Sequence, residues 1–163
     1  MSFDALVKID GIEGESTDSK HPGWIEVIQF NTGVSQMVST TASSAGGASA
    51  ERADVRPFTF LKQVDSSSPK LFQACAAGTH FDKITIAIYR AGGGEKVKFM
   101  EYELSNCIIC DVSTNGGSKG FPTENISINF GKIFVTYVKQ RRQGGGTAGN
   151  ISGGWDLQKN CKL

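Results

Sequence analysis

The chain has 163 residues, close to the size of one domain, and its 17 Lys and Arg nearly balance 16 Asp and Glu, for a net charge of +1. This balance excludes a globally basic nucleic-acid binder, and no apolar run approaches the roughly 18 residues that a membrane helix needs. The first residues lack both a basic region and a long apolar run, so we expect no secretory signal and one domain over residues 1–163.

Runs rich in β-branched and aromatic residues, separated by turn residues, follow one another along the chain. They predict about eight strands, over residues 5–9, 24–30, 58–64, 84–90, 97–104, 107–112, 126–130 and 133–138. One visible helix is too few for the crossovers of a parallel sheet, so the pattern favours a mainly β fold, an antiparallel barrel or sandwich.

One short helix is predicted over residues 69–77. Ser68 is the expected N-cap, Pro69 suits the first helical position and Gly78 supplies the stop. A helix of this length is unstable alone in water, so its apolar face must pack on the strands. That face is expected to comprise Leu71, Phe72, Cys75 and Ala76.

Several predicted strands are apolar on both faces, whereas one face of a small barrel normally meets water. In strand 24–30 two apolar sets alternate, and the same holds for strand 133–138. We therefore expect the outer face of some strands to be buried against another copy of the chain. The candidate subunit-interface residues are Ile25, Val27, Phe134 and Val138.

The stretch 36–54 consists mostly of Ala, Ser, Thr and Gly, and after Val38 it has almost nothing that could anchor it in a core. Loops of this length in compact domains are usually functional or disordered. One interpretation is a surface loop, and the other is an arm that docks on a partner through small side chains and backbone.

No constellation of residues predicts catalysis, a cofactor or a metal site. Cys107 and Cys110 form a CxxC pair within a predicted strand, where positions i and i+3 face opposite sides and cannot share a metal ion. We expect all four cysteines to be reduced thiols. The glycine-rich segment 144–149 matches GxGxxG, but no βαβ unit surrounds it, so we expect a flexible link.

Two other functions are open to a chain of this kind. A monomeric β-barrel or sandwich could bind a carbohydrate or another ligand, with Trp24 and Trp155 as stacking platforms. A β-rich hydrolase could instead use one of the two histidines, His21 or His80, with the carboxylate pair made by Glu101 and its neighbour Glu103. Loop histidines and surface glutamates are more often structural, and we expect no enzyme.

Several segments from one end of the chain to the other together resemble the Hcp family, the hemolysin-coregulated tube proteins of bacterial type VI secretion systems. The matching segments are KIDGIEGES at 8–16, WIEV at 24–27, GVSQ at 33–36, ENISINFGKI at 124–133 and GGWDL at 153–157. The resemblance implies a single antiparallel β-barrel with one short flanking α-helix and a long extended loop.

The resemblance also implies a homohexameric ring, head-to-tail stacking of rings into a tube, a contractile sheath around it, a VgrG-type spike protein at its tip and small effector proteins in its lumen. The subunit would start in the bacterial cytoplasm and be secreted through the apparatus without a cleavable signal peptide. No cofactor, nucleic acid or stable membrane insertion is expected. The extended loop would reach the adjacent ring, through the candidate stacking residues Ser39, Thr40, Ala45, Gly46, Gly47, Glu51 and Arg52.

Overall fold

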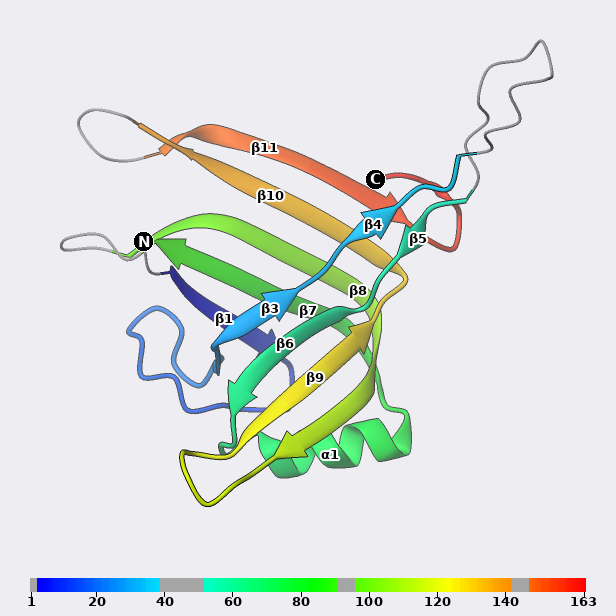
Figure 1. Ribbon diagram of the computed structural model, residues 1–163. Coiled ribbons are helices and arrows are strands. Elements are labelled where there is room, and N and C mark those ends of the chain that lie inside the picture. Colours follow the sequence, from blue (N-terminus) through cyan, green and yellow to red (C-terminus); the bar gives the residue numbers. More distant parts are fainter. Residues whose placement is uncertain (1–2, 39–51, 91–95, 142–146) are drawn as a thin grey trace, which may run out of the picture.

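The computed structural model describes residues 3–38, 52–90, 96–141 and 147–163 (Figure 1). Strands dominate these residues, which confirms the mainly β prediction, and one helix accompanies them. The elements are β1 (Phe3–Ile9), β2 (Ile25–Val27), β3 (Gln29–Asn31), β4 (Val34–Ser35), β5 (Asp54–Val55), β6 (Phe58–Gln63), α1 (Ser68–Ala77), β7 (His80–Arg90), β8 (Val97–Asn115), β9 (Thr123–Asn129), β10 (Lys132–Gln140), β11 (Thr147–Asp156) and β12 (Cys161–Lys162).

The strands pair antiparallel around β8, the longest of them. The first half of β8 pairs with β7 and β10, and its second half pairs with β9. From β9 the pairing continues to β6 and β3, while from β7 it continues to β1 and β2. Only Ile28 separates β2 from β3, and its backbone N donates to Leu61 O at 2.8 Å, so the pairing runs round the wall of a barrel.

Strand boundaries differ from the predictions where a strand changes partner. The predicted strand 24–30 is split at Ile28, because β2 pairs with β1 and β3 pairs with β6. The two predicted strands 97–104 and 107–112 form one strand, β8, which continues through Asn106 with a φ of 54°. Gly131 N lies opposite this point and donates to Ser105 O at 2.9 Å, where β9 gives way to β10.

The helix α1 begins one residue earlier than predicted, with Ser67 rather than Ser68 at the N-cap position. Gly78 ends it in the left-handed conformation, with a φ of 62°, as the sequence indicates. Leu71 is buried against the barrel, but Phe72 is 68% exposed, so the predicted apolar face is wrong on that side. The reason is geometric: successive residues of a helix are 100° apart, and the barrel covers a narrower stripe.

The barrel interior holds one large apolar cluster with an aromatic centre. Phe30 stacks on Phe58 with ring centroids 5.8 Å apart, and Tyr102 lies edge-on to Phe58 at 5.4 Å. Isoleucines from β7 and β9 complete the cluster. None of the described segments contains a helix with the length and apolar character needed to cross a membrane.

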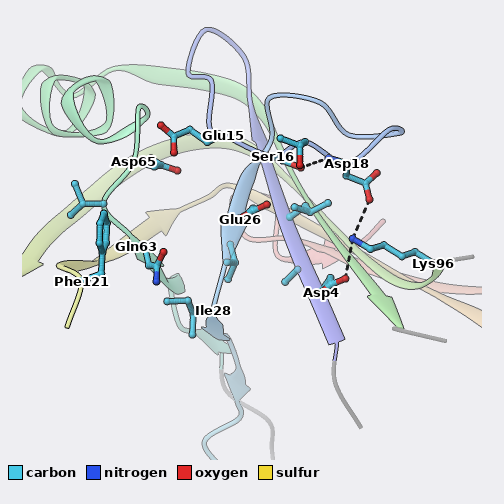
Figure 2. A pocket seen from close by; sticks show the side chains of 15 residues that line it. Asp4, Glu15, Ser16, Asp18, Glu26, Ile28, Gln63, Asp65, Lys96 and Phe121 are labelled. Atoms are coloured by element: carbon cyan, nitrogen blue, oxygen red, sulfur yellow. Dashed lines mark hydrogen bonds and ion pairs between the residues drawn. The ribbon is translucent and has the colours of Figure 1, made fainter. Parts of the chain in front are cut away.

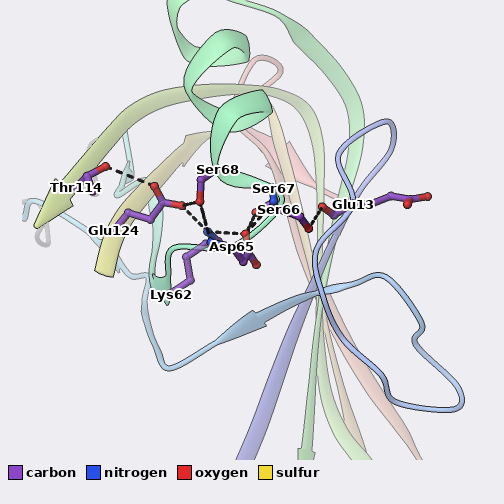
Figure 3. A network of polar contacts seen from close by, with 8 residues as sticks. All are labelled: Glu13, Lys62, Asp65, Ser66, Ser67, Ser68, Thr114 and Glu124. Atoms are coloured by element: carbon purple, nitrogen blue, oxygen red, sulfur yellow. Dashed lines mark hydrogen bonds and ion pairs between the residues drawn. The ribbon is translucent and has the colours of Figure 1, made fainter. Parts of the chain in front are cut away.

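A buried polar network fixes the start of α1 to the barrel (Figure 3). Lys62 on β6 is fully buried, and its Nζ contacts the carboxylate of Glu124, which is 2% exposed, on β9. The same Nζ lies 2.9 Å from Asp65 Oδ1 and donates to Ser68 Oγ at 3.2 Å. Ser68, the predicted N-cap, therefore serves in this network, because its hydroxyl also donates to Glu124 Oε1 at 2.5 Å.

Candidate assembly surfaces

Strand β11 leaves one edge open. On one side it pairs with β10, but on the other side β12 pairs only with its last residues, Trp155 and Asp156. Leu163 N adds a hydrogen bond to Gly154 O at 3.2 Å, so within the described chain the edge is open over residues 147–153. Those residues, TAGNISG, include no charge and no proline, the usual protections of an exposed edge strand.

The presence of β11 corrects the expected flexible link over 144–149. Residues 144–146 lie outside the described residues, but Thr147 and Ala148 are strand residues and Gly149 continues the strand with a φ of 105°. Pairing with β10 over most of its length, from Lys132↔Asp156 to Gln140↔Thr147, holds this glycine-rich segment extended. The intrinsic preference of glycine-rich sequence is for a loop, and it is the pairing with β10 that makes this segment a strand.

An apolar recess of about 540 Å³ lies beside this edge, between the sheet and the ribbon formed by β4 and β5. Val135 on β10, Trp155 on β11 and Tyr102 on β8 line it. Gly153 also lines it, although a Cβ at that position would meet no atom within 4 Å. Crowding inside the chain therefore does not require glycine at this position.

The apolar face continues outward from the recess to Tyr137 and Ile151. Tyr137 follows Val135 by two positions on β10, Ile151 precedes Gly153 by two positions on β11, and the two residues pair directly with each other. Tyr137 is 45% exposed and Ile151 55% exposed. Their position beside an open edge makes this end of β10 and β11 the strongest candidate contact surface among the described residues.

Of the four residues predicted for the subunit interface, Ile25 and Val27 lie on β2, whereas Phe134 and Val138 lie on β10, on the face opposite Val135 and Tyr137. Ile25 is 0% exposed and belongs to the main core cluster, and Val138 is 7% exposed, so both side chains are already buried within the chain. Val27 packs partly against the core, and Phe134 is half-buried. Alternation along a strand shows which residues share a face, but not whether that face is the inner or the outer one of the barrel.

Most of the predicted stacking residues, Ser39, Thr40, Ala45, Gly46, Gly47 and Glu51, lie outside the described residues. Arg52, which follows this arm, is exposed, and its guanidinium donates to Leu157 O near the C-terminus. The two ends of the arm are held together by the short β4–β5 ribbon, in which Val34 is the partner of Val55. The ribbon thus joins the two described segments on either side of residues 39–51 (Figure 1).

The two histidines take structural or surface positions. His21 Nδ1 lies 3.1 Å from Asp18 Oδ1, and its Nε2 lies 2.5 Å from the hydroxyl of Tyr89. Its ring also meets Trp24 edge-on, with centroids 4.6 Å apart, so His21 holds the loop that precedes β2. His80 is exposed at the start of β7.

Glu101 and Glu103, the glutamates considered for a hydrolase, form ion pairs with lysines. Glu101 contacts Lys98, and Glu103 Oε2 lies 3.2 Å from the Nζ of Lys83, which is 54% exposed. Each carboxylate is thus paired by its own cation on a solvated face, as expected for surface charges. Among residues 3–38, 52–90, 96–141 and 147–163, no three His, Cys, Asp or Glu side chains come together as a metal site.

The cysteines occupy the positions that the strand pattern predicts. Cys107 is fully buried and Cys110 is exposed, so the two thiols of the CxxC face opposite sides of β8. Burial raises the pKa of the Cys107 thiol to about 11. All four cysteines are free thiols, as predicted, and Cys161 is exposed near the C-terminus.

The two tryptophans do not form a joint stacking platform. Trp24 packs on a small cluster of Leu6, Ala87 and Tyr89, on the opposite face of β1 from the main core. Trp155 lines the apolar recess. Each ring is half-buried in its own surroundings.

A second hollow, a groove of about 530 Å³, lies along β1 and β2 and carries acidic residues (Figure 2). Lys96 Nζ joins two of its carboxylates, 3.1 Å from Asp4 Oδ2 and 3.2 Å from Asp18 Oδ2. The backbone N–H of Lys20, then the His21 ring and Lys96, hold the pKa of Asp18 well below its usual range. This carboxylate therefore stays ionised at neutral pH.

These features define a small antiparallel β-barrel protein with an open strand edge beside an exposed apolar face. Over residues 6–137 the chain matches the family model described as "Type VI secretion system effector, Hcp". The chain belongs to the Hcp family of type VI secretion systems.

Two kinds of relative support this assignment over the full chain. It is 33% identical to Protein hcp1 of Pseudomonas aeruginosa, over 99% of each chain. A solved structure described as a type six secretion system protein matches with a TM-score of 0.92 and 29% identity, covering 99% of this chain and 100% of the other. Hcp1 from Salmonella typhimurium matches with a TM-score of 0.81 and 29% identity, covering all of both chains.

Proposed function

We propose that this chain is the structural tube subunit of a type VI secretion system, in which six copies close into a ring and rings stack head to tail. The observation that carries the proposal is the outer end of β10 and β11, where Tyr137 and Ile151 stand beside an uncharged, open strand edge. In a ring, a neighbouring subunit would cover both the edge and the apolar side chains.

Geometry makes a cargo channel compatible with this size of subunit. A chain of 163 residues has a radius of gyration of roughly 15 Å, equivalent to a sphere about 40 Å across. Six touching spheres leave a hole about one sphere wide, so the lumen would admit a small folded protein. We infer that small effectors travel in it and that the subunit leaves the bacterial cytoplasm with them.

Stacking of rings is assigned to the arm that leaves the β4–β5 ribbon. Because Val34 and Val55 pair at its base, shortening the arm should leave the barrel intact. Deletion of residues 43–49 should therefore leave single rings but prevent tubes, as seen by electron microscopy. Loss of the rings themselves would contradict this assignment of the arm. A contractile sheath and a VgrG-type spike complete the proposed assembly.

Size-exclusion chromatography with light scattering tests the oligomer directly. Six chains of 17.4 kDa should elute as one species of about 104 kDa at micromolar concentration. A species of 17.4 kDa under the same conditions would contradict the proposed function.

A further inference from the structure

The groove along β1 and β2 is strongly negative. Its lining includes five carboxylates, of which Asp4 and Asp18 share Lys96, and Asp65 is paired with buried Lys62. Glu15 and Glu26 are exposed and have no ion pair among the described residues. The lining residues carry five carboxylates and one ammonium group, that of Lys96, which leaves an excess of four negative charges.

The same groove exposes large apolar side chains. Ile28, between β2 and β3, is 51% exposed, and Phe121, before β9, is 63% exposed. Both line the groove, and Figure 2 places them together at one end of it, beside Gln63. Apolar side chains left in water within a hollow are typical of a surface that a partner covers. The occupant that fits must combine positive charge with apolar area.

The chain itself offers such a segment at the end of β10, which we call the basic tip and define as Lys139 and Arg141. Both side chains are exposed, and neither has an ion pair within the part of the chain that the structure describes. Tyr137, 45% exposed, precedes them on the same strand. The basic tip thus combines positive charge with an apolar neighbour, as an occupant of the groove must.

The two surfaces lie on opposite flanks of the molecule. In the sheet order β11–β10–β8–β7–β1–β2, the basic tip belongs to one end and the groove to the other. Strands β8 and β7 lie between β10 and β1, and within the described chain neither Lys139 nor Arg141 forms an ion pair with a carboxylate of the groove. A contact between them joins two copies through different patches, and such a heterologous contact closes into a ring when the rotation allows it.

We propose that the acidic groove of one copy receives the basic tip of the next copy, and that this contact sets the head-to-tail order of subunits within the ring. The inference rests on the proposed ring and states which surface of the neighbouring copy the groove and the basic tip each contact. Two acidic grooves repel each other, as do two basic tips, so the same charges disfavour symmetric pairs.

A charge-swap experiment tests the contact. One variant carries Glu15→Lys and Glu26→Lys, and a second carries Lys139→Glu and Arg141→Glu. Each variant alone should need at least about tenfold more protein than the wild type for half-assembly in mass photometry at low salt, because like charges then face each other at every contact. Mixed in equal amounts, the two should assemble near the wild-type concentration, since every contact in an alternating ring of six is then complementary.

Matched reversals at exposed sites outside both surfaces, Asp82→Lys and Lys119→Glu, should assemble like the wild type. Circular dichroism melting of each variant checks that the barrel is folded, and the neutral pair Glu15→Gln and Glu26→Gln should show a weaker defect. Two results would overturn the contact if the wild type forms rings: folded swap variants that assemble normally alone, or folded swap variants whose mixture does not regain assembly. A wild type without rings would instead contradict the proposed function.

Discussion

Tyr137 on β10 and Ile151 on β11 lie directly opposite each other, and each keeps about half of its side chain in water. A cross-strand apolar pair of this kind stabilises a sheet most when it is covered. Replacing either residue by Asp should place a charge in the proposed subunit contact, and we expect sedimentation velocity to show single chains or small oligomers.

The conservative variants Tyr137→Phe and Ile151→Val serve as controls, because they keep the apolar surface. Both should sediment like the wild type. Unchanged rings in Tyr137→Asp and in Ile151→Asp would show that this face is not a subunit contact.

The buried Lys62–Glu124 pair should be essential for stability. Lys62→Met leaves the Glu124 carboxylate without its cation in the barrel interior, which typically costs about 3–5 kcal/mol of unfolding free energy. The double variant Lys62→Met with Glu124→Leu removes both charges and should recover most of the loss, as measured by urea unfolding.

The exposed pair of Lys83 and Glu103 provides the comparison. Its ends are 54% and 37% exposed, so Lys83→Met should change the unfolding free energy by less than about 1 kcal/mol. Equal losses from Lys62→Met and Lys83→Met would contradict the role of burial.

Gly14 lies where two segments approach closely. A Cβ at this position would stand 2.6 Å from Trp24 O and 2.7 Å from Ile25 Cα, both backbone atoms. Gly14→Ala should therefore force a backbone shift and cost about 1–3 kcal/mol in urea unfolding. Gly117→Ala, where no atom lies within 4 Å, should be neutral or slightly stabilising. Similar effects at both positions would contradict the close approach.

Stability should fall in acid through Asp18. Because its pKa in the folded chain is lowered from the ordinary 3.8, the ionised form stabilises the fold. That contribution is fully present above the ordinary pKa and is lost as the pH falls below it, toward the lowered value. Melting temperatures from pH 6 to pH 2 should therefore decline less steeply for Asp18→Asn than for the wild type. Parallel curves would contradict this role of Asp18.

Local patterns predicted most of the elements but not the faces they present. The β-branched runs, Pro69 and Gly78 report local preferences, and they place the barrel strands and the helix correctly. Which face is inside depends on how the barrel closes, so Ile25 and Phe72 were assigned to the wrong surroundings. The alternation of apolar residues along a strand does not show how the barrel closes.

The proposed contact surfaces have the weakest signals in the sequence. Strand β11 is extended because β10 pairs with it, although its glycines favour a loop, and so Ile151 had no visible signal beyond being an isolated apolar residue among glycines. The groove was missed because Asp4, Glu26 and Asp65 come from distant segments that only the fold unites. Lys139 and Arg141 stand close together in the sequence, but the acidic groove exists only in the folded chain.

Electron microscopy of the purified protein is the most direct test of whether the chain works as a ring-forming tube subunit. Class averages should show six-fold annuli with a central hole about 40 Å wide, the size expected from six subunits of this length. Fields of separate, featureless particles of single-chain size at micromolar concentration would contradict it.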